Sequence, residues 1–94
     1  MAQNLKEHWA SVRSDLLDLR HLFASNPGGN VSVDYFDKSL EANELEIALH
    51  ALCDRVLTAS TTRISDAEIE KVALLHVQME LADECVSSIR RKRG

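Results

Sequence analysis

The chain is nearly free of proline and glycine, with one proline and three glycines in 94 residues. These residues supply most of the tight turns that separate short strands, so their scarcity argues against a β-rich fold. With only four aromatic residues, the core must consist mostly of leucine, isoleucine, valine and alanine, which suits helices. We therefore expect an all-α fold, a small bundle of about four helices with one of them short.

A regular apolar stripe near the N-terminus predicts the first helix. Its members recur at alternating steps of four and three residues and are Leu5, Trp9, Val12, Leu16, Leu19 and Phe23. Asn4 and Glu7 form a box-like capping signal at its start. The sequence SNPGGN at 25–30 ends it, because proline and paired glycines disfavour a helix. The heptad spacing leaves a coiled coil open, although so short a stripe is more typical of a bundle helix.

A short helix and then a longer one are expected after this turn. Ser32 is the predicted N-cap of the short helix. The apolar face of the short helix comprises Val33, Phe36 and Leu40. Asn43 and Glu46 match the capping-box pattern, so the longer helix is expected to run from there to about Ala59. The core-facing side chains of the longer helix are Leu45, Ala48, Leu49, Leu52 and Val56.

A second capping box, formed by Ser65 and Glu68, predicts a last helix over about 66–90. Apolar residues cover most of its circumference. We therefore expect it at the centre of the bundle, or with part of its apolar surface forming an interface. The basic residues that follow suit the negative pole of the helix dipole. Together these elements predict a single domain over residues 1–94, with a basic C-terminal tail at 90–94.

Charge is distributed unevenly along the chain, whose net charge is −4. Residues 34–84 hold twelve carboxylates against four lysines and arginines, a net charge of −8. Phosphate binding needs a cationic surface, so this acidic body argues against direct nucleic-acid binding and is compatible with a basic protein partner. The basic tail could contact nucleic acid or an anionic membrane, but four charges at a helix end more often favour solubility and the helix dipole.

No segment of the sequence resembles a signal peptide or a membrane span. The N-terminus has no apolar core region, and no apolar run approaches 18 residues. We therefore expect a cytoplasmic protein without a membrane partner. Cys53 and Cys85 are then expected to be reduced and buried, with a disulfide as the less favoured alternative.

No established catalytic or cofactor motif occurs in the sequence. NPGGN lacks the lysine and the spacing of a phosphate-binding loop, and GxSxG, HExxH and CxxC patterns do not occur. We therefore expect no enzyme activity and assign no catalytic residue, cofactor or metal. His50 with Cys53, and His76 with Glu80, would offer four zinc-type ligands if two helices brought them together. A surface histidine and a cysteine on an apolar face are the simpler interpretation.

Residues 36–82 carry a pattern that resembles MafI-type immunity proteins and related immunity proteins of bacterial contact-dependent growth inhibition. The matching residues are Glu44, Leu45, Ile47, Ala48, Leu49, Leu52, Cys53, Asp54, Leu57, Ile64, Ser65, Glu68 and Ile69. The resemblance implies a non-enzymatic antidote that binds the C-terminal toxin domain of a secreted or surface-delivered effector. That toxin is typically a nuclease, and its cationic active-site surface would be complementary to an acidic body.

The partner-binding residues are predicted in the short helix and at the start of the next one. They are Asp34, Tyr35, Asp37, Glu41 and Glu44. The four carboxylates would face the basic toxin domain, with Tyr35 as the anchor, and cover its active or substrate-binding surface. The main alternative is a helical adaptor that self-associates through the first or last helix, so the chain is expected as a monomer or homodimer. A metal-binding regulator and a DNA-binding helix-turn-helix are further alternatives, the latter disfavoured by the acidic body.

Overall fold

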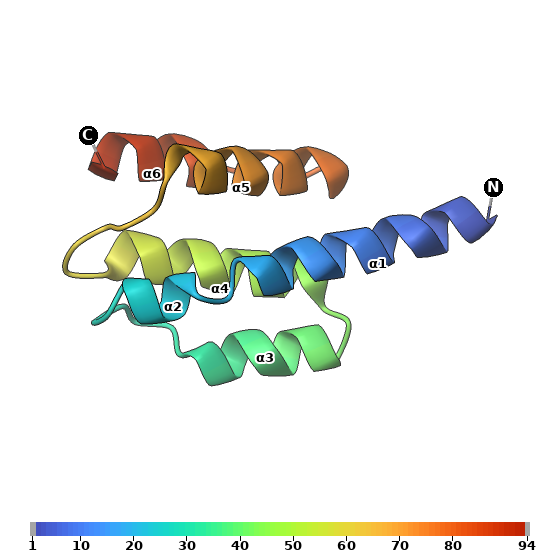
Figure 1. Ribbon diagram of the computed structural model, residues 1–94, viewed down its shortest axis with the longest axis horizontal. Helices are drawn as coiled ribbons and strands as arrows, with labels where there is room; N and C mark the ends of the chain where they lie inside the picture. The colour runs from blue at the N-terminus through green and yellow to red at the C-terminus, as the bar shows by residue number, and fades with distance from the viewer. Residues whose placement is uncertain (1, 94) are drawn as a thin grey trace.

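The computed structural model describes residues 2–93, and the side chains of residues 6–93. Six helical segments lie within this range. They are α1 (Ala2–Asp18), α2 (Leu22–Ser25), α3 (Val33–Glu41), α4 (Leu45–Thr58), α5 (Asp66–Gln78) and α6 (Cys85–Arg93). Figure 1 shows α1 and α4 in the middle, with α3 on one side and α5 and α6 on the other. No strand occurs between residues 2 and 93, so the predicted all-α fold is confirmed.

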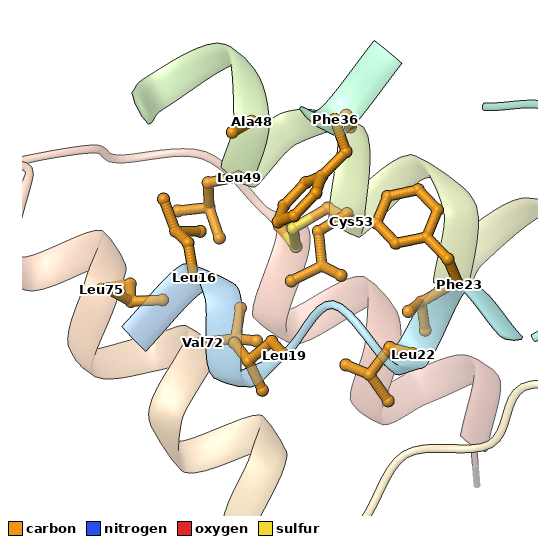
Figure 2. Packing of buried hydrophobic residues seen from close by; sticks show 14 of the residues in the cluster. Leu16, Leu19, Leu22, Phe23, Phe36, Ala48, Leu49, Cys53, Val72 and Leu75 are labelled. Carbon is orange, nitrogen blue, oxygen red and sulfur yellow. A yellow bond between two sulfur atoms is a disulfide. The ribbon is translucent and has the colours of Figure 1, made fainter. Parts of the chain in front are cut away.

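The hydrophobic core is centred on α4. Seven of its 14 residues are buried, and α1, α2, α3 and α6 all pack against it. Figure 2 shows Leu16 of α1 beside Leu49 of α4. The rings of Phe23 and Phe36 also meet in the core, with their centroids 5.0 Å apart. The centre of the bundle is therefore α4 and not the last predicted helix.

The first predicted helix is interrupted before its expected end. α1 stops at Asp18, and the N–H groups of Leu19 and Leu22 donate to carbonyls three residues back, at 3.0 Å each. Such tight turns keep the apolar stripe on one face, and its members Val12, Leu16, Leu19 and Phe23 are all buried. Trp9 is the exception and is 37% exposed. The expected cap Asn4 and the stripe residue Leu5 lie outside the described side chains.

The last predicted helix is in fact two helices, α5 and α6. Glu80 has a positive φ of 55° just after α5, and the N–H of Leu81 donates to the carbonyl of His76 at 2.9 Å. This is the Schellman arrangement, which ends a helix and redirects the chain. Asp83 then accepts a hydrogen bond at 3.0 Å from the backbone N–H of Cys85, at the start of α6. The apolar circumference predicted for one helix belongs to two helices that bury different faces.

The basic residues near the C-terminus form the last turn of α6 and contact neighbouring helices. Arg90 donates to Glu70 of α5 at 2.8 Å, and Arg93 pairs with Asp66 at the start of α5. Lys92 donates to the carbonyl of Ala59 at 2.9 Å. The end of α6 therefore neutralises part of the acidic charge of α5.

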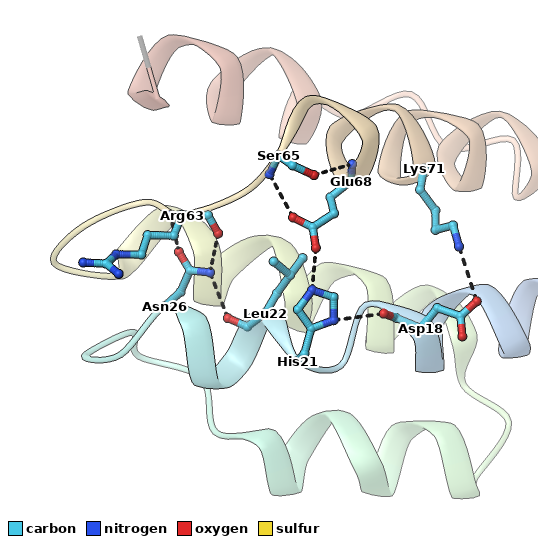
Figure 3. Close-up of polar contacts among 8 residues, drawn as sticks. All are labelled: Asp18, His21, Leu22, Asn26, Arg63, Ser65, Glu68 and Lys71. Atoms are coloured by element: carbon cyan, nitrogen blue, oxygen red, sulfur yellow. Dashed lines mark hydrogen bonds and ion pairs between the residues drawn. The ribbon is translucent and has the colours of Figure 1, made fainter.

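Of the four expected helix caps, two are present and one, at Asn4, lies outside the described side chains. The Ser32 hydroxyl accepts a hydrogen bond from the N–H of Tyr35 at the start of α3. Both bonds of the capping box form at α5. The Ser65 hydroxyl accepts from the N–H of Glu68, and the Glu68 side chain accepts from the N–H of Ser65. Figure 3 shows this reciprocal pair, and the other oxygen of Glu68 contacts His21.

The predicted capping box at Asn43 and Glu46 is wrong. Asn43 has a positive φ of 59° and ends α3, with the N–H of Glu44 donating to the carbonyl of Ser39 at 2.8 Å. Glu44 is the residue before α4, and no side-chain cap bond forms there. Only residues 42–44 join the two helices, so the residue that would cap α4 is needed to reverse the chain after α3. Asparagine tolerates this left-handed conformation better than most residues.

Asn26 fixes the loop that follows α2. It is fully buried, and its amide nitrogen donates to the carbonyls of Leu22 and Arg63 at 2.8 and 2.9 Å. Its side-chain oxygen accepts a 2.7 Å hydrogen bond from the N–H of Arg63, as Figure 3 shows. The loop after α2 is thereby tied to the connector before α5.

Arg55 of α4 holds the same loop from the other side. Its guanidinium donates to the carbonyls of Phe23, Asn26 and Val31 at 3.0, 2.7 and 2.8 Å. Gly29 passes so close that an added Cβ would lie 2.5 Å from Cδ of Arg55. The loop between α2 and α3 is therefore set by buried and part-buried polar contacts rather than by regular structure.

None of the described helices is long and apolar enough to cross a membrane.

Candidate functional site

Three of the predicted partner-binding carboxylates follow one face of α3. Asp34, Asp37 and Glu41 are spaced by three and four residues, which places them together on one side of the helix. Asp34 and Glu41 are exposed and make no ion pair with the described side chains. This face is open to a partner, and its three carboxylates lie outside the pockets described below.

Asp37 differs from its neighbours because it already has a cationic partner. Its two carboxylate oxygens accept from Nε and Nη2 of Arg20 at 2.8 and 2.7 Å. This hydrogen bonding lowers the pKa of Asp37. A toxin residue that contacts Asp37 would have to compete with Arg20, so Asp37 is a weaker candidate contact than Asp34 or Glu41.

Tyr35 is exposed on α3, about 100° around the helix from Asp34. It therefore lies beside the acidic face rather than within it. The fifth predicted residue, Glu44, is at the opposite end of α3, in the corner that leads into α4. The predicted set is thus spread along α3, and one of its members, Glu44, lines a pocket.

That pocket is a groove of about 380 Å³, which we call the Trp9 groove. Its lining residues are Trp9, Asn43, Glu44, Leu45, Glu46, Ile47 and Met79. They come from α1, the α3–α4 corner, the first turn of α4 and the end of α5. Trp9 and Ile47 are large apolar side chains that are nevertheless 37% and 38% exposed. Solvent-exposed apolar surface inside a concave site is typical of ligand- and partner-binding surfaces.

The Trp9 groove combines this apolar surface with negative charge. Glu44 and Glu46 both line it and are exposed, and neither pairs with a described cationic side chain. Trp9 itself packs edge-on against His8, with ring centroids 4.8 Å apart. Nε2 of His8 lies 3.0 Å from the carbonyl of Gln78, which ties this part of α1 to the end of α5. The groove is therefore suited to a partner segment that carries both an apolar anchor and a positive charge.

A second chemically unusual region lies between α4 and the α5–α6 corner. Cys53 and Cys85 form a disulfide, with Cα atoms 6.1 Å apart, so the prediction of two reduced cysteines is wrong. That prediction rested on the expected compartment and not on distance, and one sequence does not show that α6 begins beside α4. With the cysteines 32 positions apart in the sequence, the cross-link contributes about 3–4 kcal/mol in the chain-entropy treatment.

Two histidines and an aspartate surround this disulfide. His76 is only 6% exposed, and its Nδ1 lies 2.9 Å from the carbonyl of Val72. Its other nitrogen, Nε2, is 2.9 Å from Oδ1 of Asp83, but the alignment of the two groups is not that of a hydrogen bond. The other oxygen of Asp83 lies 2.9 Å from Nε2 of His50. Asp83 therefore bridges a buried and an exposed histidine.

Asp83 is held in its ionised form by these neighbours. Its partial burial favours the neutral acid, but the N–H of Cys85 and the two histidines outweigh that effect, and the pKa of Asp83 is lowered. Of the four residues considered as zinc ligands from the sequence, the structure brings Cys53 and His76 together with Cys85. His50 reaches them through Asp83, while Glu80 is exposed at the corner between α5 and α6.

The chain matches no protein-family model, and comparisons with curated proteins and with solved structures show no similar protein.

Proposed function

We propose that this chain is an immunity-type protein that binds the C-terminal domain of a bacterial toxin in the cytoplasm and covers its active or substrate-binding surface. The observation that carries the proposal is the Trp9 groove, an apolar concave surface bordered by exposed carboxylates. The toxin domain expected from this surface is basic, as nuclease domains are. The resemblance of residues 36–82 to immunity proteins supports the same proposal.

Each part of the surface has a separate role in this proposal. The acidic face of α3 and the acids of the groove attract a cationic domain and accelerate association. Trp9 and Ile47 provide the apolar contact from which most of the affinity derives, because a few buried aromatic and aliphatic side chains dominate protein interfaces. The proposed contact residues are therefore Asp34, Glu41 and Glu44 together with these two apolar side chains.

The test uses the small basic C-terminal domain of the large secreted protein expected from the gene immediately upstream. Co-expression of the chain should protect cells from this domain and not from unrelated toxin domains. Replacing Trp9 by alanine should weaken binding by about 30-fold or more, because a central tryptophan is typically worth at least 2 kcal/mol at an interface. Calorimetry or surface binding gives the dissociation constant, and circular dichroism checks that the variant is folded.

Leu74→Ala is the matched control, because Leu74 is also a large apolar side chain that is half exposed, on α5. It should bind the toxin domain as the unmodified chain does. Equal losses for Trp9→Ala and Leu74→Ala would contradict the assignment to the Trp9 groove. The lack of any protection, or of any secreted protein encoded upstream, would contradict the proposed function itself.

The alternative function is a helical module that self-associates, and one observation favours it. Leu74 and Val77 of α5 are 51% and 74% exposed and lie one turn apart on the same helix. If they form a dimer interface, sedimentation should show a dimer that Val77→Asp converts to a monomer. A chain that remains monomeric at high concentration would exclude this alternative.

A further inference from the structure

The disulfide lies in a cluster of side chains that are typical zinc ligands. Sγ of Cys53, Sγ of Cys85 and a ring nitrogen of His76 all lie within 4.8 Å of one another, and all three residues are buried. Two cysteines and a histidine are a common part of tetrahedral zinc sites. Because the thiolate, and not the disulfide sulfur, binds metal, this cluster becomes a ligand set only when the disulfide is reduced.

The buried His76 is oriented as a metal ligand would be. Its Nδ1 lies 2.9 Å from the carbonyl of Val72, an acceptor, so Nδ1 carries the proton. In the neutral ring, Nε2 then presents a lone pair, and this buried atom has no hydrogen-bond partner among the described residues. Metal-binding histidines commonly donate their other ring N–H to a backbone carbonyl in this way.

The position of Asp83 favours a cation beside Nε2 of His76. Its Oδ1 lies 2.9 Å from the same Nε2 of His76, so two acceptor atoms face one another unless a positive charge lies between them. In the reduced protein, a metal ion can supply that charge while it also binds the two sulfurs.

We propose that the reduced chain binds a zinc ion through Sγ of Cys53, Sγ of Cys85 and Nε2 of His76, with the carboxylate of Asp83 in the fourth position. Zinc is favoured over magnesium or calcium because thiolate and imidazole are soft or borderline ligands, whereas those ions prefer oxygen. This inference is independent of the proposed toxin-binding function, since the Trp9 groove contains none of the four residues.

The spacing of the cluster requires only small movements. Zinc–sulfur and zinc–nitrogen bonds of about 2.3 and 2.0 Å place tetrahedral ligand atoms roughly 3.5–3.8 Å apart. The three ligand atoms are already within 4.8 Å of one another, and the Cα atoms of the cysteines are 6.1 Å apart. Side-chain rotation at the cysteines therefore brings the sulfurs to zinc-binding positions without moving α4 or α6 apart.

A path for the ion is also present. A surface pocket of about 270 Å³ is lined by both cysteines, by Asp83 and by His50. Asp83, once bound to zinc through one oxygen, would keep its second oxygen on Nε2 of His50, at 2.9 Å in the structure. Hydrogen-bonded carboxylates of this kind are usual around protein zinc ions.

The chemistry of the exchange balances with a thiol reductant. Two thiol molecules transfer two electrons and two protons to the cystine, so its S–S bond breaks, two cysteine thiols form and the reductant becomes a disulfide. Zinc binding then displaces both thiol protons to water. Oxidation reverses the sequence and releases the ion. The α4–α6 connection is thus covalent in an oxidising compartment and made by metal in a reducing one.

The test compares the oxidised and reduced forms of the full chain. A phosphine reductant, which becomes the phosphine oxide by taking oxygen from water, leaves two thiols without adding a competing thiol. Cobalt(II) is then titrated as a coloured substitute for zinc. We expect the reduced chain to bind one equivalent with thiolate-to-cobalt charge-transfer absorption and to lose the signal when zinc is added. The oxidised chain should show no such band.

Circular dichroism with and without zinc separates binding from folding. A reduced chain that loses helix and regains it with zinc supports the proposal, as does a chain that stays folded and binds cobalt with the charge-transfer band. Identical cobalt absorption spectra for the oxidised and reduced forms would overturn it. Cobalt binding without charge transfer would equally overturn it, because the ion would then be bound away from the sulfurs.

Asp83→Asn tests the fourth ligand. It should weaken zinc binding by about 10- to 100-fold, the loss typical of a residue that supports a metal site. Glu80→Gln is the matched control, because it removes a carboxylate from the same corner without touching the cluster, and it should bind as the unmodified chain does. Unchanged affinity in Asp83→Asn would remove Asp83 from the site and assign the fourth position to water.

Discussion

The α3–α4 and α5–α6 corners use the same backbone turn for different purposes. Each begins with a residue other than glycine at a positive φ, Asn43 at 59° and Glu80 at 55°, and each closes with the hydrogen bonds of the Schellman arrangement. At the first corner the chain enters α4 at once, which leaves Glu44 and Glu46 exposed in the Trp9 groove. At the second corner the chain continues to Asp83 and Cys85, which face the neighbouring helix α4.

The same turn therefore sets the direction in which the chain leaves each helix, but it does not decide what the corner contacts. The residues that follow the turn decide whether the corner becomes a recognition surface or an internal connection. Three predictions separate the two corners.

The largest effect is expected from breaking the cross-link at the second corner. Cys85→Ser should lower the free energy of unfolding by about 3–4 kcal/mol in urea denaturation, measured with a metal chelator present. Reduction of the unmodified chain under the same conditions should give a similar loss, which controls for the new hydroxyl. If the free energy of unfolding falls by less than about 1 kcal/mol in both the variant and the reduced chain, the native packing of α6 does not depend on the disulfide.

A smaller effect is expected from the carboxylate of the same corner. The pKa of Asp83 is lowered in the folded chain, so its stabilising effect is present above the ordinary aspartate pKa and disappears as the pH falls through the lowered value. Asp83→Asn should therefore cost about 1–2 kcal/mol near neutral pH and almost nothing in strong acid. Glu44→Gln at the first corner should change stability by less than about 0.5 kcal/mol. A pH-independent loss in Asp83→Asn would contradict the role of its charge.

The smallest effect concerns the two residues at positive φ. Glu80→Gly should raise the free energy of unfolding by about 0.5–1 kcal/mol, because glycine adopts this conformation without the steric cost of a Cβ. Asn43→Gly should gain less, because asparagine already tolerates the left-handed region. Thermal or urea unfolding of both variants gives the comparison. Equal gains would show that the side chains of these two residues do not matter to the turns.

The sequence predicts individual helix faces well and the ends of helices less well. The apolar stripe of α1 remains buried beyond the end of the helix, because the short turns at Leu19 and Leu22 preserve its direction. The capping box at Ser65 is present because an extended connector precedes it. The matching pattern at Asn43 fails because the connector is too short to cap the second helix and also end the first one.

The break between α5 and α6 has no proline or glycine to reveal it. The indirect signal was the apolar circumference of the predicted long helix, which also fits two shorter helices that bury different faces. A second signal was Asp83, because aspartate often bonds to the backbone at the start of a helix. Neither signal gives the partner of Cys85, which depends on the position of α6 beside α4.

The candidate site was predicted only in part, for the same reason. Glu44 lies in the Trp9 groove as well as in the predicted set, but the groove also needs Trp9 from α1 and Met79 from the end of α5. These residues are far apart in the chain, and only the packing of α1, α4 and α5 brings them together. Whether the five predicted residues bind a toxin domain stays a prediction.

The contacts of Asn26 have a consequence for the order of events during synthesis. Its partner Arg63 lies 37 residues further along the chain. At about 5–20 residues per second, the ribosome adds Arg63 roughly 2–7 s after Asn26. The loop after α2 therefore leaves the ribosome well before the connector that fixes it. In a nascent chain stalled before residue 63, the loop after α2 should lack these contacts, and a protease should cut the chain there first.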